Sequence, residues 1–443
     1  MRQLDTSLLV DKTRPSTLPK KVIYILVRAR TSPNIVRWAF LLFVFTIPFE
    51  NLEATSGAAS LARIAGLLFF SICLFYPKVC FRYPPQALWW FSGYIAIYGL
   101  SGLLIPERFV GSFISRLQTL IQLLVFCWIG STLLQEEKCA RHTLLTFSIA
   151  ILLLATGIVL GLPGFSESWG EGRLSAAGLN PNGLATLMAL AAQALIGFSI
   201  DQTRRNKWIR VTFLVVSLLP LMIMVYTGSR GGIIAFLTGV AVYVLPYRGS
   251  KRKMAAILVA AIACVSVIYA VVSDQSTMSR FERSYEKGDT AGRDRLFAVS
   301  VDMISEKPLL GWHPIVYSYE LASREGWYGP HNAPHHFLQM PRDAHNLFFH
   351  LLVEVGLVGA LPFLIGLGLC VWAAWTARVS SLGLLPLTWL ITTIVANMSG
   401  TGIVDKLLWF VLALSLASGA LPAKQHNKKN LMVKAILQRR AYG

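Results

Sequence analysis

Long apolar stretches separated by short polar connections fill the chain from about residue 36 to residue 422. Most of them approach the roughly 20 residues that an α-helix needs to cross a bilayer. The stretch 345–375 is longer, and Gly356 and Gly359 interrupt it, which favours a half-helix followed by a full span. The expected spans are 36–51, 58–76, 87–105, 113–134, 143–162, 181–200, 210–227, 231–247, 254–272, 345–375, 382–400 and 405–422. The pattern predicts an all-α polytopic membrane protein of about twelve transmembrane helices.

These spans also define the parts of the chain. We expect an inner N-terminal segment at 1–35, nine spans within 36–272, a long outer loop at 273–344, three spans within 345–422 and a basic inner tail at 423–443. Within the outer loop, the apolar spacing over 290–307 predicts a helix, and Pro308 ends it.

Composition and charge agree with this layout. The chain is 54% hydrophobic and 14% charged, with a mean hydropathy of +0.56, so it lacks the polar surface of a soluble protein of 443 residues. The net charge of +19 is unevenly placed, because the short outer connections contain only Arg108, Arg173 and Arg230 as basic residues. This distribution is the positive-inside pattern. The basic residues are therefore expected to face membrane lipids, and nucleic acid is not an expected partner.

One arginine lies between two apolar spans, in Thr227-Gly228-Ser229-Arg230-Gly231-Gly232. Glycines allow backbone N–H groups to approach a ligand, and a guanidinium offers a fork of donors suited to phosphate. A helix that begins near Gly231 adds its positive end, so the turn suits an anion. The alternative is a tight turn whose arginine reaches lipid headgroups.

A second candidate is Asp343-Ala344-His345-Asn346. We expect Asp343 to cap the helix that follows and His345 and Asn346 to lie in its first turn, where the helix end disfavours a protonated imidazole. Asn346, His350 and Glu354 then form a polar stripe at four-residue spacing. Two interpretations remain open: a neutral base at His345 beside a separate packing stripe, or one buried structural network of all these residues.

Three weaker candidates follow. Arg293 and Arg295 lie at the start of the loop helix. They either bind a phosphate group or belong to a charged surface with Asp294 as their partner. Arg173 and Asn182 lie near the start of the span at 181–200, where Arg173 either reaches a ligand or the segment only forms a capped entry to the helix. Asp405 precedes the last span and either binds substrate, caps the helix or pairs with Lys406.

Several motifs are missing from the sequence. It contains no Walker loop, no dinucleotide fingerprint and no Asp-x-Asp pair, and its Cys and His residues lack metal-ligand spacing. None of the six cysteines lies in an outer connection, so no disulfide is expected. We expect neither a cofactor nor a metal.

The order of these motifs resembles the O-antigen ligase family of the O-antigen ligase and polymerase superfamily. The resemblance rests on the outer Gly-Ser-Arg-Gly-Gly turn, on Arg293 followed by Glu306-Lys307-Pro308-Leu309-Leu310-Gly311, and on Ala344-His345-Asn346-Leu347 followed by Glu354-Val355-Gly356-Leu357-Val358-Gly359. It covers about 170–400 directly.

The resemblance implies a metal-independent glycosyltransferase of the GT-C type in the inner membrane of a Gram-negative bacterium, with its active site facing the periplasm. Such an enzyme moves a glycan from undecaprenyl diphosphate to a sugar hydroxyl of lipid A–core. Arg230 and Arg293 correspond to arginines linked with the diphosphate, and His345 to the proposed base. Residues expected to contact substrate are Arg173, Asn182, Ser229, Arg295, Asn346 and Asp405. Direct displacement of the diphosphate inverts the anomeric centre.

Other functions remain open. An O-antigen polymerase uses the same donor with a second glycan as acceptor, and a protein O-oligosaccharyltransferase is similar but usually has a longer C-terminal region. A flippase or transporter of lipid-linked sugars favours charged groups within the spans, where this chain has only a few, such as Arg63, Arg116 and Glu354.

Overall fold

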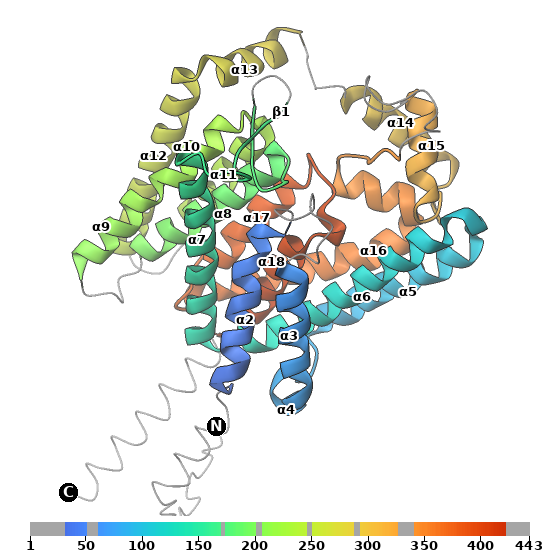
Figure 1. Cartoon of the computed structure of the whole chain (residues 1–443), viewed down its shortest axis with the longest axis horizontal. Helices are drawn as coiled ribbons and strands as arrows, with labels where there is room; N and C mark the ends of the chain where they lie inside the picture. The colour runs from blue at the N-terminus through green and yellow to red at the C-terminus, as the bar shows by residue number, and fades with distance from the viewer. Residues whose placement is uncertain are drawn as a thin grey trace, which may run out of the picture.

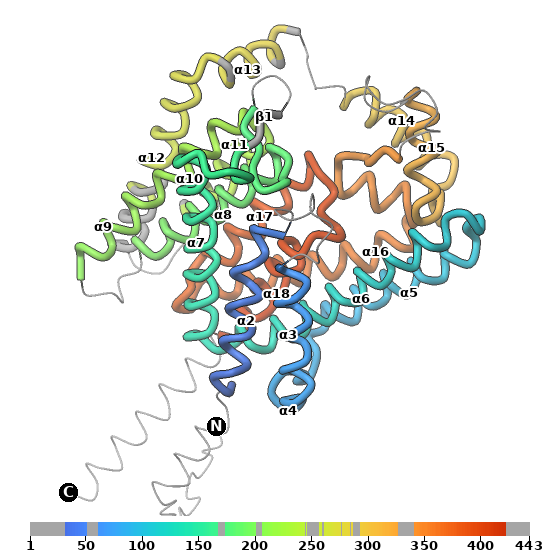
Figure 2. The backbone as a smooth tube through the Cα atoms, in the orientation of Figure 1, coloured from blue at the N-terminus to red at the C-terminus, as the bar shows by residue number. Residues whose placement is uncertain are grey.

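A computed structural model of the chain describes residues 32–50, 61–169, 173–200, 206–245, 250–287, 293–326 and 341–421. The inner N-terminal segment up to residue 31 and the tail at 423–443 lie outside the described residues. The described part is mostly helical, with one small β-hairpin (Figures 1 and 2).

The apolar stretches expected from the sequence all contain helix. The helices in these stretches are α2 (Asn34–Thr46), α3 (Leu61–Phe75), α5 (Gln86–Ser101), α6 (Val110–Leu133), α7 (Glu137–Val159), α8 (Pro181–Ile200), α9 (Lys207–Val216), α10 (Leu218–Tyr226), α11 (Arg230–Ala241), α12 (Ser250–Ser273), α16 (Leu347–Thr376), α17 (Leu385–Ala396) and α18 (Lys406–Ser418). Short 3₁₀ turns extend or precede several of them: η1 (Ile47–Phe49), η2 (Gly102–Leu104), η3 (Glu107–Phe109), η5 (Val242–Val244), η6 (Ala377–Val379) and η7 (Gly402–Val404).

Among the described residues, six helices are long and apolar enough to cross a membrane. They are Gln86–Leu104, Glu107–Leu133, Glu137–Val159, Pro181–Ile200, Lys207–Tyr226 and Leu347–Val379. A seventh candidate is a pair of helices bent by 87°, Ala261–Ser273 with Thr277–Arg283. The other apolar helices are shorter than a typical span. The helical membrane class is thus supported, whereas the count of twelve spans stays a prediction.

α8 is the central helix of its half of the molecule, packed against α7, α9, α10, α11 and α17. Its alanines are buried along most of its length, and such small side chains let neighbouring helices approach closely. One polar group joins three helices here: Nε2 of Gln193 donates to Oγ1 of Thr392 at 2.7 Å and to the carbonyl of Phe236 at 3.3 Å. Satisfied polar groups of this kind fix the helix register where water is excluded.

Elements between the spans gather at one end of the molecule in Figure 1. They are the antiparallel hairpin of β1 (Glu167–Trp169) and β2 (Arg173–Ser175), α13 (Gln275–Lys287), α14 (Arg293–Glu306) and α15 (Val316–Glu325). α4 (Pro77–Cys80) lies at the other end. It belongs to the connection after the second expected span, and two spans return the chain to the side of the inner N-terminal segment. This arrangement agrees with the sidedness deduced from the basic residues.

α16 is broken at Gly356, as the sequence predicts, where the backbone adopts φ 63° and ψ −171°. The segment Pro308–Trp312 fills the break. The amides of Leu357 and Val358 donate to the carbonyls of Pro308 (2.8 Å) and Leu309 (3.1 Å). In return, the amide of Trp312 donates to the carbonyl of Val353 at 2.7 Å. We call this set of backbone hydrogen bonds the clasp; it fixes the outer loop to a membrane helix.

Two glycines make the clasp possible. A Cβ at Gly356 would lie 2.3 Å from the carbonyl oxygen of Leu309, and a Cβ at Gly311 (φ 66°) would lie 2.6 Å from the amide nitrogen of Gly356. Only a residue without a side chain fits this close approach of two backbones. The clasp therefore gives a structural reason for two of the sequence motifs, Pro308-Leu309-Leu310-Gly311 and Glu354-Val355-Gly356.

We predict that Gly356→Ala destabilises the protein by more than about 2 kcal/mol, because it adds left-handed strain and a backbone clash. Gly368→Ala is the matched control in the same helix, since no atom lies within 4 Å of the added Cβ; it is expected to be neutral or stabilising by about 0.5–1 kcal/mol. The measurement is thermal unfolding of the purified protein in detergent. Equal midpoints for the two variants would contradict the role of the clasp.

Candidate functional site

The turn before α11 is a helix N-terminus that carries an arginine. Ser229 is the N-cap of α11, and its hydroxyl accepts from the amide of Gly232 at 3.1 Å. The helix begins at Arg230, whose Nη1 donates to the backbone carbonyl of Arg280 in α13 at 3.0 Å. The positive end of the helix and the guanidinium are therefore next to each other, which favours an anion.

Two other candidates from the sequence join this turn. Oδ1 of Asn182 accepts from Oγ of Ser229 at 2.7 Å and from Nη2 of Arg173 at 3.2 Å. Nε of Arg173 donates to the carbonyl of Thr227 at 3.2 Å. The structure thus brings Arg173, Asn182 and Ser229 together, with Asn182 as the bridge between β2 and the turn.

Arg293 at the start of α14 lies near the same place. Its Nη1 donates to Oγ of Ser399 at 3.0 Å. Burial lowers the pKa of Arg293, and the positive charges of Arg230 and Arg280 lower it further. An arginine stays protonated nonetheless, so the three guanidinium groups repel one another, and an anion between them relieves that repulsion.

Arg280 is a residue that the sequence reasoning missed. Arg280 and Arg173 approach the turn from two directions: a Cβ at Gly228 (φ 60°) would lie 3.8 Å from side-chain carbons of both, which is an ordinary van der Waals distance. We call Arg173, Arg230, Arg280 and Arg293 the arginine cluster. Nothing in the spacing around Arg280 distinguishes it from the other basic residues of the loop; only the fold places it there.

Arg295, in contrast, lies elsewhere. Its terminal nitrogen is 3.7 Å from the position that a Cβ at Gly326 would occupy, at the C-terminal end of α15. The role of Arg295 in binding substrate stays a prediction, and its position does not support it.

The loop before α16 differs from the expectation. Asn346, not Asp343, is the N-cap of α16, and its Oδ1 accepts from the amides of Phe348 (2.9 Å) and Phe349 (3.2 Å). The expected cap at Asp343 is therefore wrong, and His345 lies before the helix rather than in its first turn. The physical reason is competition: asparagine caps as well as aspartate does, while the Asp343 carboxylate is engaged by Thr401 and His350.

His345 adopts a left-handed backbone, with φ 47°. Such a conformation costs a non-glycine residue free energy and is typical of functional or tightly held positions. Burial lowers the pKa of His345; the carboxylate of Asp343 opposes this shift, and the charges of Arg342 and Arg293 add to it. His345 is therefore neutral near pH 7 and able to accept a proton.

A buried polar network lies beside this loop. Nδ1 of His350 is 3.0 Å from Oδ1 of Asp343 and 2.8 Å from the hydroxyl of Tyr317. Nε2 of His350 is 3.0 Å from Nη2 of Arg116 and 3.2 Å from Oε2 of Glu354. Nη1 of Arg116 is 3.9 Å from the fully buried Glu354. Asp343, His350 and Glu354 therefore belong to the structural network, whereas His345 stands apart from it.

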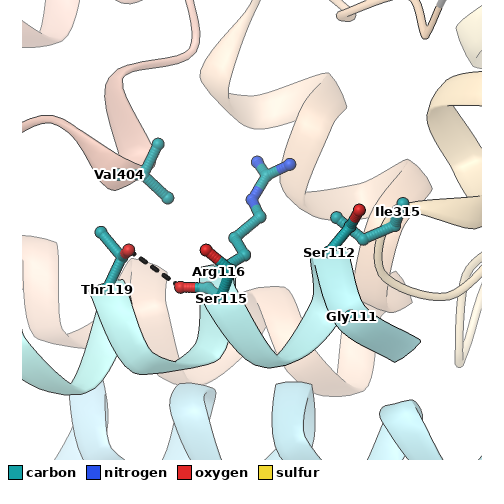
Figure 3. A pocket seen from close by; sticks show the side chains of 7 residues that line it. All are labelled: Gly111, Ser112, Ser115, Arg116, Thr119, Ile315 and Val404. Atoms are coloured by element: carbon teal, nitrogen blue, oxygen red, sulfur yellow. Dashed lines mark hydrogen bonds between the residues drawn. The ribbon is translucent and has the colours of Figure 1, made fainter. Parts of the chain in front are cut away.

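Arg116 joins this network from α6, far away in the sequence. An arginine inside an apolar span was itself a signal, because such a charge is costly in a membrane unless it serves a purpose. Arg116 also lines a cavity of about 530 Å³, together with Gly111, Ser112, Ser115, Thr119, Ile315 and Val404 (Figure 3).

The turn between α17 and α18 contacts three segments that carry candidate site residues. Its residues make three hydrogen bonds with the start of α16 and the loop before it. The carbonyl of Asn397 accepts from the amide of Leu347 at 2.9 Å, the carbonyl of Met398 accepts from Nδ2 of Asn346 at 3.4 Å, and the hydroxyl of Thr401 donates to Asp343. Ser399 contacts Arg293, and a Cβ at Gly231 would lie 2.8 Å from its Oγ. The turn thus connects α11, α14 and the histidine loop, a role that the sequence did not indicate.

Asp405 occupies the N-cap position of α18 but makes no side-chain cap hydrogen bond. Lys406 forms an ion pair with Glu50. The predicted alternative, an ion pair between Asp405 and Lys406, is therefore not the pair that Lys406 forms. A Cβ at Gly402 would lie 2.9 Å from Oδ2 of Asp405. A contact between Asp405 and the substrate stays a prediction.

Within the part of the chain that the structure describes, no group of three or more His, Cys, Asp or Glu residues could hold a metal ion.

Taken together, the fold and these contacts define a helical membrane protein with a cluster of arginines that suits an anion and lies close to a neutral histidine. The family model described as O-antigen ligase matches residues 213–364, about a third of the chain. This region therefore carries an O-antigen ligase domain, and the resemblance inferred from the motifs is confirmed for it. The match includes Arg230, Arg280, Arg293 and His345. A comparison with curated proteins found no match.

The arginine cluster makes a direct prediction for anion binding. Arg293→Gln is expected to weaken the binding of inorganic pyrophosphate about ten- to hundredfold, because a hydrogen bond to a charged group contributes about 1.5–3 kcal/mol. Arg295→Gln removes the same charge from the same helix but is expected to change the affinity less than about twofold. Titration calorimetry on the detergent-solubilised protein measures both. Equal losses would show that only the net charge of α14 matters.

Proposed function

We propose that this protein is an O-antigen ligase: it transfers a glycan from undecaprenyl diphosphate to a sugar hydroxyl of lipid A–core. The observation that carries the proposal is the convergence of Arg230, Arg280 and Arg293 near the N-terminus of α11, with His345 close enough for Arg293 to influence its pKa. The family domain over 213–364 supports the same class of enzyme.

The arginine cluster is proposed to bind the lipid diphosphate. Guanidinium groups offer paired donors that match phosphate oxygens, and the amides at the start of α11 add to them. These groups are fixed before the reaction by contacts to Asn182, Ser399 and the backbone of Arg280. Preorganised charge of this kind stabilises the negative charge that develops on the leaving diphosphate. The proposed mechanism needs no metal ion.

His345 is proposed to be the general base. The acceptor hydroxyl attacks the anomeric carbon, its proton passes to the imidazole, and the bond to the diphosphate breaks with its electron pair on the phosphate oxygen. This single displacement inverts the anomeric centre. A base that is neutral at pH 7 is in the correct state to accept the proton.

The proposal also assigns a membrane and an orientation to the protein. The outer elements that hold the site gather at one end of the molecule, and we assign that end to the periplasm and the protein to the inner membrane of a Gram-negative bacterium. A GT-C architecture with twelve spans belongs to this proposal. Its partners are the undecaprenyl-diphosphate glycan, lipid A–core and membrane lipids.

Reconstitution tests the proposal. With undecaprenyl-diphosphate glycan and lipid A–core in proteoliposomes, we expect glycan on the core, and His345→Ala is expected to lower the rate at least about 10²-fold while pyrophosphate still binds. His142→Ala, at an exposed position in α7, is the control and should transfer normally. A lengthened donor instead indicates a polymerase, and transport of the donor without transfer indicates a flippase.

The pH profile of kcat/KM tests the base separately. Its acid limb is expected below pH 6.5, because burial disfavours the protonated imidazole and the rate is lost only as pH falls through the lowered pKa. Asp343→Asn removes a carboxylate that raises the pKa of His345, so the limb should move to lower pH. Arg342→Gln removes a charge that lowers this pKa, so the limb should move to higher pH. Shifts of the same sign in both variants would rule out His345 as the titrating group.

A further inference from the structure

The cavity at the outer end of α6 is polar on one side and apolar on the other. Ser112, Ser115 and Thr119 present their hydroxyls from α6 (Figure 3). Ile315, at the start of α15, and Val404, in η7, contribute apolar surface. The cavity of about 530 Å³ is largely open to its surroundings, and its volume lies within the range of roughly 300–1,000 Å³ that holds small ligands.

This cavity is linked to the loop that carries His345. The side chain of Arg116 points from α6 into the cavity, and its guanidinium is 3.0 Å from His350. His350 is in turn 3.0 Å from Asp343, two residues before His345. Val404, which lines the cavity, is three residues after Thr401, which bonds to Asp343. The cavity and the histidine loop therefore share their supporting residues.

The charge around the cavity differs from that of the arginine cluster. Arg116 is the charged residue among those that line it, and the buried carboxylate of Glu354 lies 3.9 Å away. The side chain of Arg116 is 22% exposed, whereas that of Glu354 is 0% exposed, so the arginine offers donors while the network compensates its charge. Compensated charge makes the cavity a poor site for an anion such as diphosphate.

Hydroxyl groups, a guanidinium and two aliphatic side chains instead suit a neutral sugar ring. Sugar hydroxyls both donate and accept hydrogen bonds, as serine and threonine hydroxyls do. The hydroxyl of Thr119 donates to the carbonyl of Ser115 at 2.9 Å, so its lone pairs remain as acceptors. Ile315 and Val404 match the C–H face of a sugar ring.

We propose that this cavity is the acceptor subsite, where a neutral sugar ring of the acceptor glycan binds while a hydroxyl of the same glycan reaches His345. The inference rests on the proposed function. It places donor and acceptor on different elements: the diphosphate on the arginine cluster of β2, α11, α13 and α14, and the acceptor sugar on α6, α15 and η7.

Filling the cavity tests the inference. Ser115→Leu places an aliphatic side chain in the cavity at an exposed position of α6, and Gln118→Leu makes the same change at an exposed position of α6 that does not line it. Ser115→Leu is expected to raise the KM for lipid A–core at least about tenfold and Gln118→Leu less than about twofold. The affinity for inorganic pyrophosphate should be unchanged in both. Equal KM values for the acceptor would overturn the inference.

A binding measurement separates the inference from the proposed function. Calorimetry with the delipidated core oligosaccharide should show weaker binding to Ser115→Leu, by about tenfold, and two- to tenfold weaker binding to Thr119→Val, which keeps the shape and loses one hydrogen bond. If the wild type binds this oligosaccharide in the cavity but transfers no glycan, the proposed function fails and the subsite stands. If transfer is normal and neither variant changes binding, the subsite fails alone.

Discussion

The backbone hydrogen bonds of the clasp are the constraint on which the rest of the site depends. They join Pro308–Trp312 to the break of α16 at Gly356, so a loop between spans becomes part of a membrane helix. Without them, the broken helix would leave unpaired amides and carbonyls in a low-dielectric region, at a cost of several kcal/mol for each group. The clasp thereby sets the positions of α14 and α15, which carry Arg293 and Tyr317.

The site itself combines a strained loop with a rigid support. His345 has a left-handed backbone, and the residues around it are held by Asn397, Thr401 and the buried network of His350. Buried charges are tolerated there because each has a partner, and breaking one pair leaves the other charge without compensation. A loop supported in this way holds His345, the proposed base, in a fixed position.

The sequence predicted the helical membrane class and the break at Gly356, because apolar length and glycine are local signals. It also singled out Arg230, Arg293 and His345, whose roles stay proposals. It misplaced the N-cap of α16, since Asp343 and Asn346 are equally good caps and only the distant Thr401 and His350 decide between them. It also missed Arg280 and Ser399. Their roles arise from contacts between segments far apart in the chain, which no local pattern records.

The turn between α17 and α18 has a consequence for biogenesis. A ribosome makes the chain from its N-terminus, so Arg230, Arg293 and His345 emerge well before Ser399 and Thr401, which hold Arg293 and the histidine loop. The hairpin of α17 and α18 is therefore made after the candidate site residues that its turn contacts. A nascent chain that ends before this turn has the candidate arginines and histidine but lacks the contacts that hold them, so these residues take their final positions only after the turn has been made.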